Sequence, residues 1–84
     1  MKTHFGTASV HVHDDRVSLA AVNEILARKA HLILGRVELT DAGGDVAVSL
    51  IVRGTDNELG TLVAELEALP NVKASLFLPK WDDE

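Results

Sequence analysis

The fold of this chain is decided by residues 35–77, GRVELTDAGGDVAVSLIVRGTDNELGTLVAELEALPNVKASLF. This stretch reads as a strand, a glycine-containing turn, a second strand, a capped helix and a final strand. An alternating strand at 7–13 and a helical pattern that follows Asp15 precede it, so the element order is βαββαβ. This order predicts an α+β, ferredoxin-like fold, with a four-stranded antiparallel sheet in the order 4-1-3-2 and two helices on one face.

The boundaries of the elements follow from periodicity and from turn residues. We expect strands at 7–13, 32–40, 46–53 and 72–78, with a hairpin loop at 41–45 whose two glycines permit a positive φ. The first helix is capped by Asp14 or Asp15 and ends near Ala30 or His31. The second helix begins with a capping box formed by Thr55 and Glu58. Its predicted apolar stripe consists of Leu59, Leu62, Val63, Leu66 and Leu69.

Composition sets limits on the class of protein. The 84 residues make one domain, 1–84, in which we expect residues 1–6 and 80–84 to be flexible. The formal net charge of −5 argues against binding of nucleic acid by this domain alone, because a phosphate backbone requires clustered Lys and Arg. The chain has no Cys, which excludes disulfides, thiolate nucleophiles and Cys-ligated metals. No apolar run is long enough to span a membrane, so we expect a soluble, cytoplasmic protein.

The sheet face opposite the helices is predicted to be open and chemically mixed. Its predicted residues are His11, His13, Arg36, Glu38, Ser49, Ile51, Arg53, Ser75 and Phe77. Apolar residues within a polar surround are typical of a subunit interface or a ligand platform, and we assign Arg36, Ile51 and Phe77 to an interface. The edge strand LILGRVEL at 32–39 lacks Lys and Pro, so pairing with another copy would protect it. We therefore expect a homo-oligomer, a dimer or a tetramer.

Several segments of the chain share a family pattern. They are Val22–Leu26, Ile33–Arg36, Val48–Val52, Thr55–Gly60 and Leu69–Lys73, and the Gly35-Arg36 and Leu69-Pro70-x-Val72 steps are the most specific of them. In these segments the chain resembles the small ACT-like regulators of the iron-only hydrogenase system. That family is related in fold to ACT domains and to the C-terminal domain of the nickel-responsive regulator. Two positions differ from the pattern: Asn71 replaces a usual Gly, and Val37-Glu38 replaces a Met-Gly pair.

His11 and His13 are the candidate metal ligands. At positions i and i+2 of a strand both imidazoles project from one face and can share a divalent metal such as nickel or zinc. The nickel-responsive regulator uses a His-x-His on a strand in this way, but it also uses a Cys, which is missing here. A site would need further ligands, from Asp14, Asp15, His4 or another subunit. The alternative is that the two imidazoles bond to neighbouring groups or water, and we interpret His4, in the frayed terminus, and His31 as structural.

The loop Asp14-Asp15-Arg16 is the candidate effector site. In amino-acid-sensing ACT domains the equivalent loop closes over the ligand at a subunit interface, and the resemblance implies the same location here. Asp14 could hold an ammonium group and Arg16 a carboxylate. The alternative is a capping Asp followed by a solvated charge pair.

The sequence contains no catalytic motif. No residue spacing in it places a nucleophile beside a base in a cleft. We therefore predict a non-enzymatic regulatory module that binds a small effector, an amino acid or a metal ion, at a subunit interface. The alternative function is a metal-handling protein or a small ferredoxin-like enzyme that uses His11 and His13.

Overall fold

A computed structural model describes residues 2–80 of the chain. Strand β1 spans His4–Val12, helix α1 Arg16–Arg28, the 3₁₀ turn η1 Ala30–Leu32, strand β2 Ile33–Thr40, strand β3 Val46–Gly54, helix α2 Asp56–Glu67 and strand β4 Val72–Phe77. The predicted element order βαββαβ is therefore confirmed.

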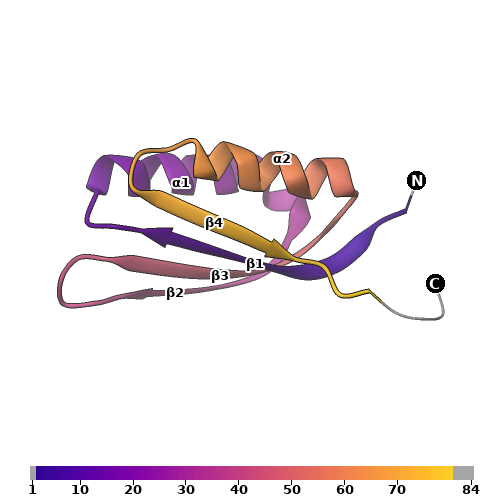
Figure 1. Ribbon diagram of the computed structural model, residues 1–84, viewed down its shortest axis with the longest axis horizontal. Helices are drawn as coiled ribbons and strands as arrows, with labels where there is room; N and C mark the ends of the chain where they lie inside the picture. The colour runs from indigo at the N-terminus through magenta and orange to yellow at the C-terminus, as the bar shows by residue number, and fades with distance from the viewer. Residues whose placement is uncertain (1, 81–84) are drawn as a thin grey trace.

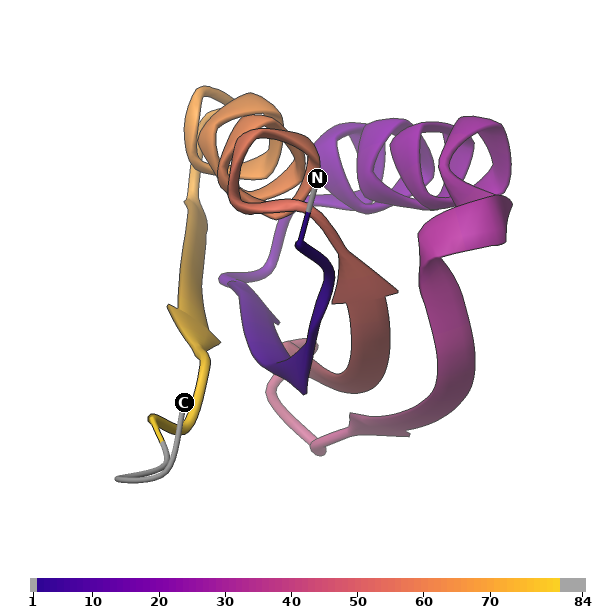
Figure 2. The same cartoon turned by 90° about the vertical axis from the view of Figure 1, so that its right-hand side faces the viewer.

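The four strands form one sheet in the order β2-β3-β1-β4, and every neighbouring pair is antiparallel. This is the predicted 4-1-3-2 order read from the opposite edge. Both helices lie on one side of the sheet, and Figures 1 and 2 show that no element covers the other side among the described residues. We call that uncovered side the open face.

The core lies between the sheet and the two helices, because alternate residues of the two central strands are apolar. The inward residues of β3 and most of those of β1 are almost completely buried. From α1, Val22, Ile25 and Leu26 meet them, and from α2, Leu59, Leu62 and Leu66. The predicted capping box is present, since the Thr55 hydroxyl accepts from the Glu58 amide and the Glu58 carboxylate accepts from the Thr55 amide.

A β-bulge in β2 overturns part of the predicted open face. The pairing of β2 with β3 shifts between Ile33 and Gly35, so Leu34 is an extra residue in the strand. Successive side chains of a strand point to opposite faces of the sheet. One extra residue therefore moves every side chain beyond it to the opposite face. Gly35, Val37 and Leu39 now lie level with the outward residues of β3. The prediction that Arg36 and Glu38 lie on the open face is wrong.

Arg36 instead lies on the helix side of β2. Its register partner is the buried Leu50, and its guanidinium donates to Asn23 Oδ1 of α1 at 2.5 Å. The same guanidinium also donates to the Glu38 carboxylate. These two charges are thus removed from the open face, and two large apolar side chains, Val37 at 62% exposure and Leu39 at 72%, take their place on it.

The ends of several elements differ from their predicted positions. Strand β1 starts at His4 rather than Thr7 and ends before His13. His4 therefore belongs to the sheet, where it pairs with Gly54 and places its Nε2 3.2 Å from a carboxylate oxygen of Asp56. Helix α1 ends at Arg28, and the following turn is 3₁₀. Most of the tail at 80–84 lies outside the described residues.

Gly6 is required where β1 passes the end of β4. A Cβ atom at this position would lie 2.3 Å from the Phe77 carbonyl oxygen and 2.6 Å from Leu78 Cδ2. A backbone oxygen that close cannot be accommodated without moving β4 away from β1. Gly60, in the middle of the exposed side of α2, has no atom within 4 Å of the equivalent point.

These two glycines give a matched pair of substitutions. Gly6→Ala is expected to lower the free energy of unfolding by about 1–3 kcal/mol, because the methyl group overpacks the contact between the strands. Gly60→Ala is expected to raise it by about 0.5–1 kcal/mol, since alanine favours the helix. Urea denaturation of both variants measures the two changes, and equal effects would contradict the close approach at Gly6.

Candidate functional site

Three segments that are distant in the sequence meet at one end of the sheet. They are the hairpin loop between β2 and β3, the end of β1 and the start of β4. An open cleft of about 1030 Å³ lies there. Its lining residues are His11, Val12, His13, Leu39, Thr40, Asp41, Asp45, Val46, Ala47, Glu67, Asn71, Val72 and Lys73.

The hairpin that forms one wall of the cleft is organised by Asp41. Its carboxylate accepts from the Gly43 amide at 2.8 Å and from the Asp45 amide at 3.0 Å. Gly44 has a φ of 93°, which glycine adopts without strain. The opposite side of the cleft includes Glu67, whose carboxylate accepts from the Ala74 amide of β4 at 2.9 Å.

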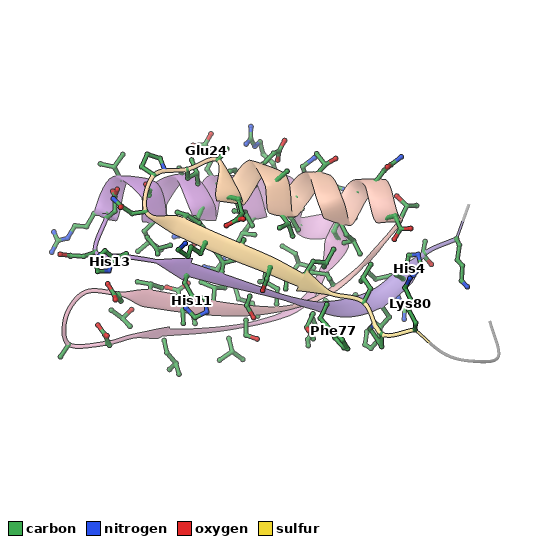
Figure 3. All side chains as sticks on the ribbon, in the orientation of Figure 1. His4, His11, His13, Glu24, Phe77 and Lys80 are labelled. Carbon is green, nitrogen blue, oxygen red and sulfur yellow. The ribbon has the colours of Figure 1, made fainter. Side chains whose placement is uncertain are left out.

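His13 connects the hairpin loop to the end of β1. Its Nδ1 lies 2.9 Å from Asp45 Oδ1, and its backbone amide donates to the Asn71 carbonyl at 2.8 Å. The two predicted metal ligands, His11 and His13, are both exposed at this end of the molecule (Figure 3). Within residues 2–80 no group of three or more His, Cys, Asp or Glu side chains is placed to hold a metal ion. Whether His11 and His13 bind a metal stays a prediction.

The side chains of Lys73 and His11, in the cleft, have no hydrogen-bond or ion-pair partner within the described chain. Lys73 of β4 is the register partner of His11 of β1, and the small Ala47 of β3 lies on the other side of His11. Neither Lys73 nor His11 makes an ion pair or a side-chain hydrogen bond with another residue in 2–80. Sequence reasoning missed Lys73, Asp41 and Asp45, because only the register brings them beside the two histidines.

The predicted effector loop lies next to this cleft but does not line it. Asp15 is the N-cap of α1: its Oδ1 accepts from the Ser18 amide at 3.0 Å, and its Oδ2 accepts from the Asn71 side chain at 3.0 Å. Asp14 has a φ of 42° and packs against the hairpin, since a Cβ on Gly44 would lie 2.7 Å from Asp14 Oδ1. Arg16 is exposed. The capping role that the sequence offered as the alternative is therefore present at Asp15.

Asn71 explains one departure from the family pattern. Its φ is 60°, in the left-handed region that glycine enters freely and asparagine more easily than other residues. Its side chain donates to Asp15, and the neighbouring Pro70 carbonyl accepts from the Ser18 hydroxyl at 2.6 Å. The turn before β4 is thus tied to the start of α1.

Comparison with known proteins assigns the chain to a family. The model of the TM1266-like family, described as a candidate iron-only hydrogenase system regulator, matches residues 4–75. The chain belongs to this family. No curated protein matches the sequence significantly.

Solved structures support the fold. The protein TM1266 from Thermotoga maritima superimposes with a TM-score of 0.89 at 21% identity, over 94% of this chain and 100% of that one. The ACT domain of GTP pyrophosphokinase from Chlorobium tepidum gives a TM-score of 0.77 at 13% identity, over 90% and 100% of the two chains. The C-terminal domain of MgtC from Mycobacterium tuberculosis gives 0.66 at 15% identity, over 90% and 89%.

These matches confirm the ACT-like, ferredoxin-like fold and the predicted resemblance to the hydrogenase system regulators. Family membership indicates a regulatory role, because the family is described as a candidate hydrogenase system regulator. Among residues 2–80, no helix is both long enough and apolar enough to cross a membrane.

The cap at Asp15 predicts a specific dependence of stability on pH. The hydrogen bond from the Ser18 amide, followed by that from Asn71, holds the pKa of the Asp15 carboxyl below its ordinary value of 3.8. The folded-state pKa is thus lower than the unfolded-state pKa, so the stabilisation is complete above the unfolded value and is lost as the pH falls through the folded value. Asp15→Ala should therefore lower the Tm at pH 7, and the deficit relative to wild type should shrink at acid pH.

This effect is measured by thermal unfolding of the wild type, Asp15→Ala and Asp15→Asn between pH 7 and pH 2. The lowest pH is about two units below the ordinary pKa of the Asp15 carboxyl. Asp15→Asn is the control, because its amide oxygen can still cap the helix but does not titrate. A Tm deficit of Asp15→Ala that stays constant down to the lowest pH would contradict the assigned role of the carboxylate.

Proposed function

We propose that this chain is a non-enzymatic regulatory module, which acts as a homo-oligomer in the cytoplasm and binds a small effector. The observation that carries the proposal is the open cleft beside the hairpin, where the Lys73 ammonium, the His11 imidazole and the hairpin carboxylates line one concave surface. Membership of a regulator family and the ACT-like fold support the regulatory part.

A free amino acid is the effector that fits the charges of the cleft best. Lys73 and His11 have no partner within the described chain, so the Lys73 ammonium offers a charge-assisted hydrogen bond to a carboxylate and the His11 imidazole offers a further hydrogen bond. Asp41 and Asp45, on the hairpin, offer oxygens to an ammonium group. Leu39 and Ala47 supply an apolar floor for a side chain.

The loop Asp14-Asp15-Arg16 has a supporting part in this proposal. Asp14 packs against Gly44 of the hairpin, and Asp15 binds the turn before β4, so the loop contacts two of the segments that form the cleft. A ligand that draws these segments together stabilises one arrangement of the loop and of α1, which is how occupancy would be passed to a partner.

Effector binding is tested with a panel of amino acids in a thermal-shift screen followed by calorimetry. A ligand that binds the folded state raises the Tm. For any amino acid that binds, Lys73→Ala should weaken the affinity about tenfold or more, since a charged hydrogen bond contributes about 1.5–3 kcal/mol.

Lys29→Ala is the matched control, because Lys29 lies at the end of α1 and does not line the cleft. No shift with any amino acid would remove the support for this effector. An equal loss of affinity in both lysine variants would show that the site lies elsewhere.

Metal binding is the second candidate, and one observation favours it. Asp45 lies within hydrogen-bond distance of His13 Nδ1, which is the arrangement by which a carboxylate orients a metal-binding imidazole. His13 Nε2 and His11 could then take nickel or zinc, with the remaining ligands supplied by another copy.

The metal content of purified protein decides this second candidate. The double variant His11→Ala/His13→Ala should lose bound nickel or zinc measured by elemental analysis after dialysis. His31→Ala should retain it, because His31 is in η1, at a distance from the cleft lining. Equal metal content in all three proteins would end the metal hypothesis.

A further inference from the structure

On the open face, residues that are register partners on neighbouring strands form rows that run across the sheet, perpendicular to the strands. The central row, which we call the serine row, consists of Val37, Ser49, Ser9 and Ser75, one from each strand in the order β2-β3-β1-β4. The first flanking row consists of Gly35, Ile51, Thr7 and Phe77. The second flanking row, on the side of the hairpin, consists of Leu39, Ala47, His11 and Lys73.

We propose that a second copy of this chain packs on the open face, through a two-fold axis that runs along the serine row. The proposal rests on the homo-oligomer of the proposed function and names the surface that forms it. Leu39, Phe77 and Val37 are 72%, 63% and 62% exposed in the single chain, so the fold leaves large apolar side chains of this face in water. Figure 3 shows Phe77 pointing away from the helices.

The serine row permits the close approach that such packing requires. Ser9 is the register partner of both Ser49 and Ser75, so three adjacent strands present only a small side chain at the same level. Two sheets pack face to face at a separation of about 10 Å. Small side chains on the axis let the larger ones of the flanking rows interdigitate.

The two flanking rows are complementary in size under this axis. A rotation about the serine row reverses the strand direction but keeps the strand order, so each strand lies over the same strand of its partner. On β3, Ile51 lies opposite the partner's Ala47, and on β2, Gly35 lies opposite the partner's Leu39. On β4, Phe77 lies opposite the partner's Lys73, where a cation–π contact can form.

Charge is complementary under the same axis. Arg53 lies four residues beyond the serine row on β3, and Asp45 immediately precedes β3, four residues before the serine row. Arg53 therefore lies opposite the partner's Asp45 at each end of the interface. Arg53 makes a cation–π contact with Phe5, 5.2 Å from the ring centroid, and forms no ion pair among residues 2–80.

The alternative two-fold axis, parallel to the strands, is less favourable. It would also place large side chains opposite small ones, but it would gather Asp41 and Asp45 of both copies at one end and both Arg53 side chains at the other. Like charges of the two copies gather at the same ends in that arrangement, which opposes association. Charge therefore selects the axis along the serine row.

This dimer would also complete the cleft. The second flanking row belongs to the cleft lining, and the partner's Ile51 and Phe77 lie over it. Two equivalent clefts form in each dimer, each bordered by the partner's Arg53. Effector binding and dimer formation would then be coupled, because the ligand contacts both copies.

A cross-linking experiment tests the surface. The chain has no Cys, so Ser9→Cys and Ser49→Cys each introduce a single thiol next to the axis. Both variants should form a covalent dimer with a short thiol cross-linker. Thr61→Cys is the matched control, since it places a thiol on the exposed side of α2 and should remain monomeric on a denaturing gel.

A charge exchange tests the axis by sedimentation equilibrium of the full chain. Arg53→Glu should raise the dimer dissociation constant about tenfold, because each dimer contains two of these pairs. The double variant Arg53→Glu/Asp45→Arg should return it towards the wild-type value. Arg28→Glu, on the exposed side of α1, is the control and should leave the constant unchanged.

The outcomes separate this inference from the proposed function. A stable dimer whose Ser9→Cys and Ser49→Cys variants do not cross-link would overturn the inference but leave the homo-oligomer in place. A dimer that cross-links but is indifferent to Arg53→Glu would overturn the chosen axis. A wild-type chain that remains monomeric, with the open face free for another protein or a nucleic acid, would overturn both the inference and the homo-oligomer.

Discussion

The structure depends on the position of β1 between β3 and β4. This strand pairs with both neighbours along most of its length. The register of these pairings therefore fixes which side chains of the three strands lie beside one another and on which face. Its residues Ala8, Val10 and Val12 are buried on one side. The helices have apolar stripes that must also be buried, and the apolar side of the sheet is the surface that can take them. Both helices therefore lie together, and the opposite face is left open.

The bulge in β2 then decides the chemistry of the open face. A regular strand would have directed Arg36 and Glu38 to the open face and two apolar residues to the helices. The extra residue at Leu34 exchanges these sides, so that Arg36 reaches Asn23 of α1. The open face becomes apolar at one edge, with its charges at the two ends of the strands. This distribution is the basis of the proposed two-fold packing.

The candidate site was only partly predictable, for reasons that particular residues make clear. His11 was placed correctly on the open face, because it lies in the regular part of β1. Asp15 was predicted to be part of the effector loop, but its two carboxylate oxygens accept hydrogen bonds from Ser18 and Asn71 and hold the turns together. Lys73 carries no local signal, since it is one exposed residue in a short edge strand. Its proximity to His11 comes from strand pairing over a large sequence separation.

The sequence by itself determined the element order, the sheet order and the capping box, because periodicity and capping are set by residues a few positions apart. It also determined that the inward residues of β3 are apolar. Only the tertiary structure decided which side of β2 faces the helices, how far β1 extends toward the N-terminus, and which charges gather beside the hairpin. Those features depend on the register between strands, and register is fixed by packing across the sheet rather than by local preference.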